Sequence, residues 1–216
     1  MYELPPVELR QRVGSQHTDA EFLAIGRKCV ADITRAVPDR EYHDALDFGA
    51  GCGRMLRHLL PTFHPAYWCA TDPDTEAMHW VAEHFATVAT FAVAPGEPLP
   101  LEPRSLDLII AVSVFSHLRD WQPTLADLRR VLRPGGVLAF SYLGARCYAR
   151  KGLPYAELTE PLIEPMTYCA ANPDYTNTHC PAGWAAKQVA RHCNVLSDIP
   201  AGLAGFQDLL VAERPT

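Results

Sequence analysis

The chain has 216 residues, of which 48% are hydrophobic and 20% are charged, and its formal net charge at pH 7 is -6. This composition is typical of a globular protein and excludes intrinsic disorder and collagen-like structure. The length favours one domain with one hydrophobic core. The negative charge, with no basic run longer than the pair Arg129 and Arg130, argues against a nucleic-acid substrate.

Membrane, export and metal signals are all missing from the sequence. No apolar run reaches the ~20 residues of a membrane-spanning helix, and the first residues lack the regions of a signal peptide. We therefore expect a cytoplasmic protein with no membrane partner. The seven cysteines form no Cys-x-x-Cys pair, so we expect reduced thiols. Neither His179-Cys180 nor His192-Cys193 has zinc-ligand spacing, and no metal is predicted.

From residue 44 onward, short apolar runs alternate with amphipathic stretches, a pattern typical of βαβ units in a parallel sheet. The continuous apolar run at 106–112 predicts a strand at the centre of that sheet. In chain order we predict one or two helices in 13–36, a strand at 45–48, a helix at 54–60 that Pro61 stops, a strand at 66–70, a helix at 75–85, strands at 90–93 and 106–112, a helix at 124–132, a strand at 137–142, a helix at 182–193, and strands at 194–199 and 207–212 that form an antiparallel sheet edge.

The pattern weakens between residues 143 and 178, where four prolines and several tyrosines indicate an insertion or lid. We therefore expect a single domain over 1–216 in four parts. These are cap helices at 1–43, a cofactor-binding core at 44–142, a lid or substrate insertion at 143–180, and a C-terminal helix and strand pair at 181–216.

The segment 47–53 reads Asp-Phe-Gly-Ala-Gly-Cys-Gly, so that its glycines directly follow the first predicted strand, which ends at residue 48. Glycines at such a place let the backbone approach a ligand closely and turn into the next helix, which indicates a nucleotide-like ligand. A dinucleotide fingerprint would place its third glycine at position 54, where this chain has Arg54. The spacing therefore differs from that of a dinucleotide site.

Two acids accompany the loop. Asp47 lies two residues before the first glycine, and a carboxylate there favours a ligand with an ammonium group over a pyrophosphate. Asp72 ends the next predicted strand, where a carboxylate can accept hydrogen bonds from ribose hydroxyls. Together the two acids point to an adenosyl group joined to an amino acid.

With these features the chain resembles a class I S-adenosylmethionine-dependent methyltransferase of small-molecule type over about residues 44–213. Residues 98–109 resemble the fourth-strand signature of that family, and 128–136, Leu-Arg-Arg-Val-Leu-Arg-Pro-Gly-Gly, resemble its helix and turn before the fifth strand. The resemblance implies an α/β, Rossmann-like, doubly wound sheet of seven strands. That sheet would be mostly parallel, with its last strand antiparallel, an N-terminal helical cap and a lid after strand 5.

The resemblance also implies S-adenosylmethionine as cofactor and S-adenosylhomocysteine as product. The glycine loop would contact the methionine part, the acid after the second strand the ribose, and the residues after the third strand the adenine. Because that third strand is followed by no acid, the adenine contact would be through backbone. The implied cofactor-binding residues are Asp47, Gly49, Ala50, Gly51, Asp72, Pro73, Ala94, Pro95 and Ser113.

His117 is the candidate general base, because the segment after the central strand lies where open α/β sheets bind ligands. The alternative is that it hydrogen-bonds loop backbone or the cofactor. Ser116 precedes it where related quinone-type methyltransferases have a metal-binding acid, which again predicts no metal. The substrate-pocket candidates, each equally explained as a packing residue, are Tyr142, Tyr168, Tyr175 and His179. Cofactor-capping candidates, otherwise part of a solvated helix start, are Arg10, Arg12 and Gly14.

The implied reaction is in-line displacement at the sulfonium methyl, in which positioning supplies much of the acceleration. The acceptor is expected to be a small molecule, because 113–115 lack the Asn-Pro-Pro-Tyr type of loop found in enzymes that methylate nucleic-acid amines. Two alternatives stay open. One is an NAD(P)-dependent oxidoreductase, which Arg54 disfavours, and the other is a non-catalytic module with a cofactor fold.

Overall fold

The computed structural model describes residues 2–14, 18–64, 66–150, 152, 154–166 and 176–216. The helices are α1 (Val7–Arg12), α2 (Asp19–Ala36), α3 (Leu56–Thr62), α4 (Thr75–His84), α5 (Gln122–Val131), α6 (Ala145–Ala149) and α7 (Trp184–Val189), with short 3₁₀ turns η1 (Phe115–His117) and η2 (Tyr155–Glu157). The strands are β1 (Asp44–Phe48), β2 (Tyr67–Asp72), β3 (Val88–Ala92), β4 (Leu106–Ala111), β5 (Leu132–Tyr142), β6 (Leu162–Pro165), β7 (Thr176–His179), β8 (Asn194–Leu203) and β9 (Gln207–Glu213).

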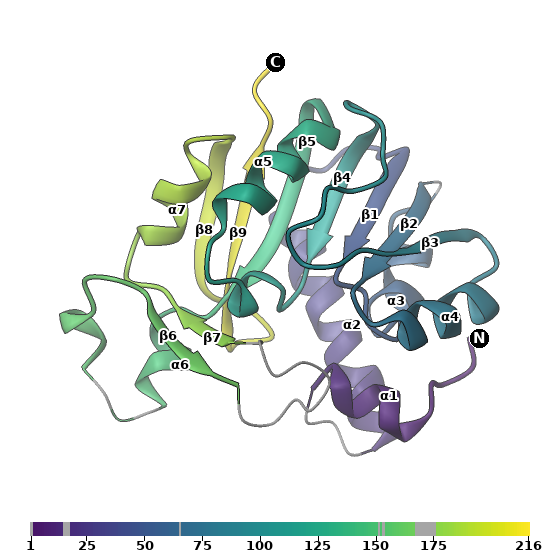
Figure 1. Cartoon of the computed structure of the whole chain (residues 1–216), viewed down its shortest axis with the longest axis horizontal. Coiled ribbons are helices and arrows are strands. Elements are labelled where there is room, and N and C mark those ends of the chain that lie inside the picture. The colour runs from purple at the N-terminus through teal and green to yellow at the C-terminus, as the bar shows by residue number, and fades with distance from the viewer. Residues whose placement is uncertain (1, 15–17, 65, 151, 153, 167–175) are drawn as a thin grey trace.

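Seven of these strands form one sheet in the order β3-β2-β1-β4-β5-β9-β8 (Figure 1). The five strands from β3 to β5 are parallel to one another, and β9 is antiparallel to both β5 and β8. The predicted α/β class, the seven-stranded sheet and its antiparallel last strand are confirmed. The predicted edge pair is also found, with β9 inserted between β5 and the outer strand β8.

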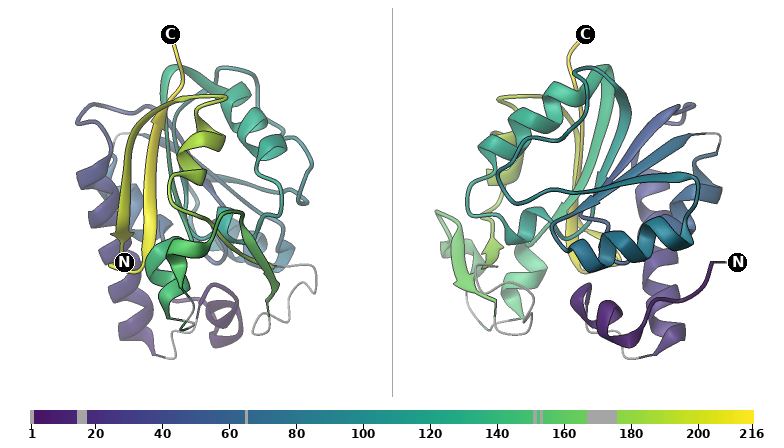
Figure 2. Two further views of the ribbon diagram at one scale, coloured as in Figure 1. Left: turned by 90° about the vertical axis from the view of Figure 1, so that its left-hand side faces the viewer. Right: turned by 45° about the vertical axis from the view of Figure 1, so that its right-hand side comes forward.

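Alternate residues of the central strands face opposite sides of the sheet, as the period of two for a strand requires. On β4, Leu108 and Ile110 contact a core formed with α2, α3 and α4, whereas Ile109 contacts a core formed with α5 and α7. The helices therefore cover both faces, and Figure 2 shows the two helical layers on either side of the strands. A sheet covered in this way exposes only its edges and its ends to ligands.

The carboxyl ends of the parallel strands meet along one edge of the sheet, at the bottom of Figure 1. Two parts of the chain lie below that edge: α1 from the N-terminus, and the segment after β5 that holds α6, η2 and the antiparallel β6–β7 ribbon. β7 is tied back to the sheet by the Cys180 N–H, which donates to the Leu143 carbonyl at 2.8 Å.

Several element boundaries differ from the sequence prediction, among them those of α3 and β5. α3 begins at Leu56 and includes Pro61, because a proline in the last turn removes only one helical hydrogen bond. β5 begins at Leu132, where the helix was expected to end and five residues before the predicted start of the strand. Leu132 pairs with Leu106, and a register shift then accommodates the Pro-Gly-Gly turn before Val137 pairs with Leu108.

Candidate functional site

A cavity of about 1530 Å³ lies at the carboxyl edge of the sheet. It is bordered by the glycine loop, the N-terminal segment, the loops after β3 and β4, the insertion after β5 and the β8–β9 turn. The predicted cofactor residues that line it are Gly49, Ala50, Gly51, Asp72, Pro73, Ala94, Pro95 and Ser113, and the predicted acceptor-side residues that line it are His117 and His179.

The backbone amides of the glycine loop are used within the protein. The N–H groups of Gly49 and Ala50 both donate to the Thr71 carbonyl, at 2.8 and 3.0 Å. The Gly51 N–H donates to Asp72 Oδ2 at 2.8 Å. A pyrophosphate site depends on such amides being directed at the ligand, so this loop is arranged differently from a pyrophosphate-binding one.

All three glycines of the loop have left-handed backbone, with φ of +79° at Gly49, +51° at Gly51 and +80° at Gly53. A Cβ at Gly49 would overlap the Val114 side chain, and one at Gly51 would overlap the Val13 side chain. The loop therefore needs glycine both for its dihedral angles and for close packing. Val13 and Val114 line the cavity, and no sequence signal identified them because their contacts are with residues distant in the chain.

Asp47 is a buried acid behind this loop. It is 1% exposed, and among the described residues no hydrogen-bond partner lies near its Oδ2 atom. Burial and the negative charge of Asp72 raise the pKa of Asp47 to about 7, although the positive charge of Arg54 acts in the opposite direction. Asp47 does not itself line the cavity. A cationic group bound nearby would stabilise its ionised form.

Asp72 links the glycine loop to the start of α4, the helix that follows β2. Its Oδ1 atom accepts the Asp74 N–H at 2.9 Å, while its Oδ2 atom holds Gly51. Burial raises the pKa of Asp72 from its ordinary value, against the effect of those two N–H donors. Because each carboxylate oxygen has more than one lone pair, both can accept further hydrogen bonds from a ligand in the cavity.

The N-terminal segment reaches the cavity through Arg12, whose guanidinium binds Asp74 at 2.9 Å and Glu76 at 2.7 Å. Arg12 and Gly14 line the cavity, as expected. Arg10 does not: it pairs with Asp19 at 2.5 Å and lies 5.9 Å from the Phe22 ring. These contacts with Asp19 and with the Phe22 ring hold the Arg10 guanidinium away from the cavity.

His117 lies in η1, directly after β4, and lines the cavity. Its Nδ1 atom is 2.8 Å from the Thr176 carbonyl, which can only accept, so the neutral ring carries its proton on Nδ1. Burial lowers the pKa of His117. The Thr176 hydroxyl also donates to the His117 carbonyl at 3.2 Å, so two hydrogen bonds join β7 to η1.

The other acceptor-side candidates have different surroundings. Tyr142 is 3% exposed and does not line the cavity, because its hydroxyl donates to Asp198 on β8 at 2.7 Å. His179 is buried, with Nε2 3.6 Å from Glu164 Oε2 and its ring 5.8 Å from that of Tyr148. Tyr168 and Tyr175 lie outside the described residues.

A hydrogen-bonded polar group joins the ends of β4, β5 and β9, and it includes Ser113, which the sequence predicted as a cofactor-binding residue. The Ser113 N–H donates to Ser141 Oγ at 2.8 Å, and Ser141 Oγ donates to Gln207 Oε1 at 2.5 Å. Gln207 and Ser113 both line the cavity. The register of β5 with β9, which brings these side chains together, has no local signature in the sequence.

Among the described residues, no group of three or more His, Cys, Asp or Glu side chains is arranged to hold a metal ion. None of the described helices combines the length and the hydropathy that crossing a membrane requires.

Comparison with known proteins gives consistent results. A family model described as a methyltransferase domain matches residues 46–138. A malonyl-[acyl-carrier protein] O-methyltransferase of Hahella chejuensis is 36% identical over 101 residues, which cover 46% of this chain and 36% of that protein. The protein of the same name from Dechloromonas aromatica is 32% identical over 134 residues, covering 62% of this chain and 48% of that protein. The chain thus spans about a third to a half of the length of these relatives.

The fold is similar to that of solved methyltransferases. The S-adenosylmethionine-dependent methyltransferase of Mesorhizobium loti superposes with a TM-score of 0.64 at 16% identity, covering 85% of this chain and 96% of that one. The matched region begins within β1 and ends within β5, so it contains the glycine loop and the strands β2, β3 and β4. Residues 46–138 therefore match a methyltransferase domain, and the whole sheet has the Rossmann-like fold of the S-adenosylmethionine-dependent methyltransferases.

Proposed function

We propose that the protein transfers the methyl group of S-adenosylmethionine to a small-molecule acceptor. The observation that carries this proposal is the arrangement of the loop. Its amides at Gly49, Ala50 and Gly51 are bonded within the protein, while the carboxylates of Asp47 and Asp72 lie beside it. A site with acids and with engaged amides suits a cationic adenosyl ligand and disfavours a pyrophosphate.

The residues present fit S-adenosylmethionine. The buried Asp47 oxygen without a hydrogen-bond partner among the described residues is matched to the positive charge of the ligand, and Asp72, which lines the cavity, is matched to its ribose hydroxyls. We assign the glycine loop to the methionine part, and Ala94 and Pro95 to the adenine side, through their backbone. When bound, the cofactor would supply an electrophilic methyl group on sulfur.

The task of the chain itself is to orient the acceptor and to manage its proton. We assign the proton-accepting role to His117, which lines the cavity and whose neutral form bears its lone pair on Nε2. The lowered pKa keeps the ring neutral at pH 7, so it can accept a proton there. His179 lines the same cavity and is assigned to acceptor contacts. Ser113, which the sequence predicted on the cofactor side, is reassigned to acceptor contacts because it is hydrogen-bonded to Gln207.

The relatives support an acceptor of modest size. The proteins of Hahella chejuensis and Dechloromonas aromatica are named for O-methyl transfer to a malonyl group on an acyl-carrier protein. A small acyl compound, free or attached to a carrier, is therefore the first class to test. The dehydrogenase alternative is disfavoured by the engaged amides of the glycine loop.

The test is an assay of S-adenosylhomocysteine formation with defined pools of carboxylic acids, phenols, amines and thiols. The proposal predicts product above the acceptor-free background in at least one pool, and less product from the Asp72→Ala variant when the cofactor is sub-saturating. Background rates in every pool, from protein that binds the cofactor, would contradict methyl transfer to a small acceptor and favour the non-catalytic alternative.

A further inference from the structure

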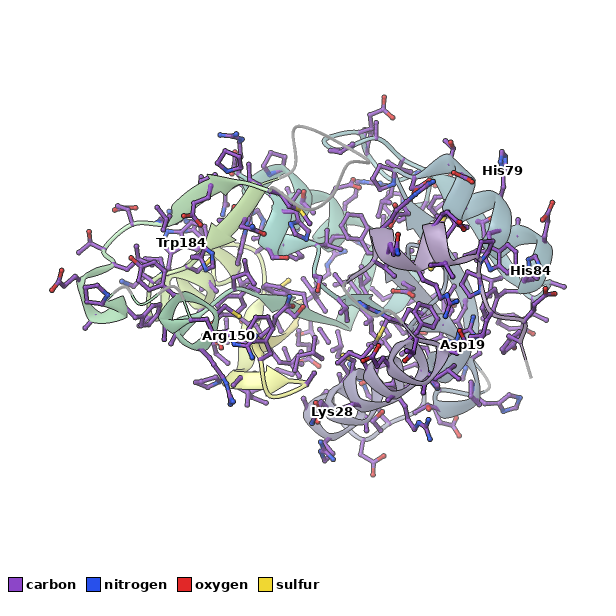
Figure 3. All side chains as sticks on the ribbon, turned by 90° about the horizontal axis from the view of Figure 1, so that it is seen from below. Asp19, Lys28, His79, His84, Arg150 and Trp184 are labelled. Carbon is purple, nitrogen blue, oxygen red and sulfur yellow. The ribbon has the colours of Figure 1, made fainter. Side chains whose placement is uncertain are left out.

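Four residues form one wall of the cavity, here called the donor wall: Ser113, Arg150, Phe206 and Gln207. The Arg150 guanidinium lies over the Phe206 ring, 4.5 Å from its centroid, and Figure 3 shows Arg150 beside the β8–β9 end of the sheet. Gln207 Nε2 donates to Ser113 Oγ at 3.0 Å. Because Phe206 and Gln207 are consecutive, these two contacts belong to the same surface.

The hydrogen bonds of this wall can be followed atom by atom. The hydroxyl of Ser141 accepts from the Ser113 N–H and gives its own proton to Gln207 Oε1. The Gln207 amide then gives one proton to Ser113 Oγ. An amide nitrogen has two protons, and the described residues provide no acceptor for the second. The Ser113 hydroxyl proton has only the longer, 3.2 Å contact to Gln207 Oε1, an atom already bonded to Ser141.

Ser113 is held in a conformation that serines rarely adopt. Its φ is +61°, a left-handed value that is strained for a residue with a Cβ. The hydrogen bond from its N–H to Ser141 helps to maintain that conformation. Backbone strain at a residue that lines a cavity indicates that the position of its side chain matters for binding.

The donor wall contains no acid. Among the described residues no carboxylate lies within ion-pairing distance of Arg150, and the nearest acid in sequence to the wall, Asp208, does not line the cavity. Asp208 is turned instead toward Gly144, where a Cβ would overlap its Oδ2 atom, and it accepts the Ala201 N–H at 2.8 Å. The wall therefore offers one positive charge and neutral donors.

We infer that the donor wall binds a carboxylate of the acceptor, with Arg150 as a specificity-determining residue and Ser113 and Gln207 as additional donors. This inference rests on the proposed function and names the chemical class of its acceptor. One guanidinium matches the single charge of a carboxylate, whereas a phosphate dianion would remain half uncompensated. Stacking on Phe206 limits the motion of the guanidinium and reduces the entropy lost on binding.

The experiment measures affinity at saturating S-adenosylhomocysteine for two isosteric pairs of probes, octanoate with octanamide and benzoate with benzamide. The wild type is expected to bind each carboxylate about 10-fold or more tightly than its amide. Arg150→Gln is expected to abolish that preference, and Arg150→Lys to retain part of it. Succinyl pantetheine, compared with its terminal amide, tests the same preference for an acceptor carried on a thioester.

Arg146→Gln is the matched control, because Arg146 is an exposed arginine on α6, the helix that ends just before Arg150, and it does not line the cavity. It removes the same charge and should leave the preference unchanged. The inference would be overturned if the wild type bound the carboxylate and amide probes equally or bound neither of them. It would also be overturned if the two arginine variants had equal effects.

The affinity for S-adenosylhomocysteine, measured in the same variants, separates the two proposals. Intact cofactor binding without carboxylate preference contradicts the donor wall alone. If S-adenosylhomocysteine does not bind, the proposed function is contradicted. The probe pairs are then compared on the protein without cofactor, where a preference for the carboxylates supports the donor wall and its absence contradicts it.

Discussion

Asp72 accepts the Gly51 N–H at 2.8 Å and so ties the end of β2 to the loop that follows β1. A carboxylate assigned to the ribose is thus also part of the scaffold of the glycine loop. The same side chain accepts the Asp74 N–H, which orients the residue that caps α4. Loss of this carboxylate should therefore affect ligand binding and local structure together.

Asp72→Ala is predicted to weaken S-adenosylhomocysteine binding by about 10- to 100-fold, because it removes charge-assisted hydrogen bonds. Isothermal titration calorimetry measures this effect. Glu102→Ala, which removes an exposed acid outside the cavity, is the control and should bind like the wild type. Equal affinity of the two variants would exclude Asp72 from the cofactor site.

Asp47→Asn is predicted to stabilise the ligand-free protein at high pH. The pKa of Asp47 is raised to about 7 in the folded protein, whereas an unfolded chain has the ordinary value near 3.8. The folded state therefore holds a proton that the unfolded state loses between these values, and stability falls as pH rises from about 4 to 7.

Thermal melts without ligand test this prediction. The difference in melting temperature, Asp47→Asn minus wild type, should increase from pH 5 to pH 8. Addition of S-adenosylhomocysteine should reverse the order at pH 8, since only the wild type has the charge that the ligand matches. A difference independent of pH would show that Asp47 is ionised throughout the range.

His117 is predicted to be neutral at pH 7 with its proton on Nδ1. Burial lowers its pKa below the ordinary 6.5, so the folded state resists protonation and stability is lost as pH falls from about 6.5 through the folded pKa. Nitrogen-15 NMR of the imidazole checks the tautomer directly. His117→Gln, which cannot take up a proton, should lose less stability between pH 7 and pH 5 than the wild type, and an equal loss would contradict this assignment.

Gly49→Ala is predicted to be more damaging than Gly96→Ala, although both glycines have left-handed backbone. An added Cβ at Gly96 meets nothing within 4 Å, so that variant should lose only about 1–2 kcal/mol from backbone strain. At Gly49 the Cβ overlaps Val114, so the loop or that side chain must move as well. Urea unfolding of the two variants measures the difference, and equal losses would mean that packing against Val114 is unimportant.

The sheet was predictable because its signals are local. The run 106–112 predicted the central strand, found as β4 at Leu106–Ala111, and the glycines after β1 predicted a close turn at the carboxyl edge. Helix ends were less predictable: α7 covers only Trp184–Val189 of the predicted 182–193, since amphipathic pattern alone does not define where a short helix ends.

The acceptor side was less accessible to sequence reasoning because it depends on contacts between distant residues. Tyr142 was expected in the pocket, but the pairing of β5, β9 and β8 brings its hydroxyl to Asp198 instead. The same pairing places Gln207 beside Ser113, a contact between residues 94 positions apart. No motif within either segment indicates it.

The central claim, that the glycine loop and its two acids bind an adenosyl cation, is tested most directly by paired calorimetric titrations of the wild-type protein. One uses S-adenosylhomocysteine, whose ammonium group is positive, and the other uses NADH, whose pyrophosphate is negative. The account predicts saturable binding of S-adenosylhomocysteine with one site per chain and no measurable binding of NADH. Saturable binding of NADH without binding of S-adenosylhomocysteine would contradict it.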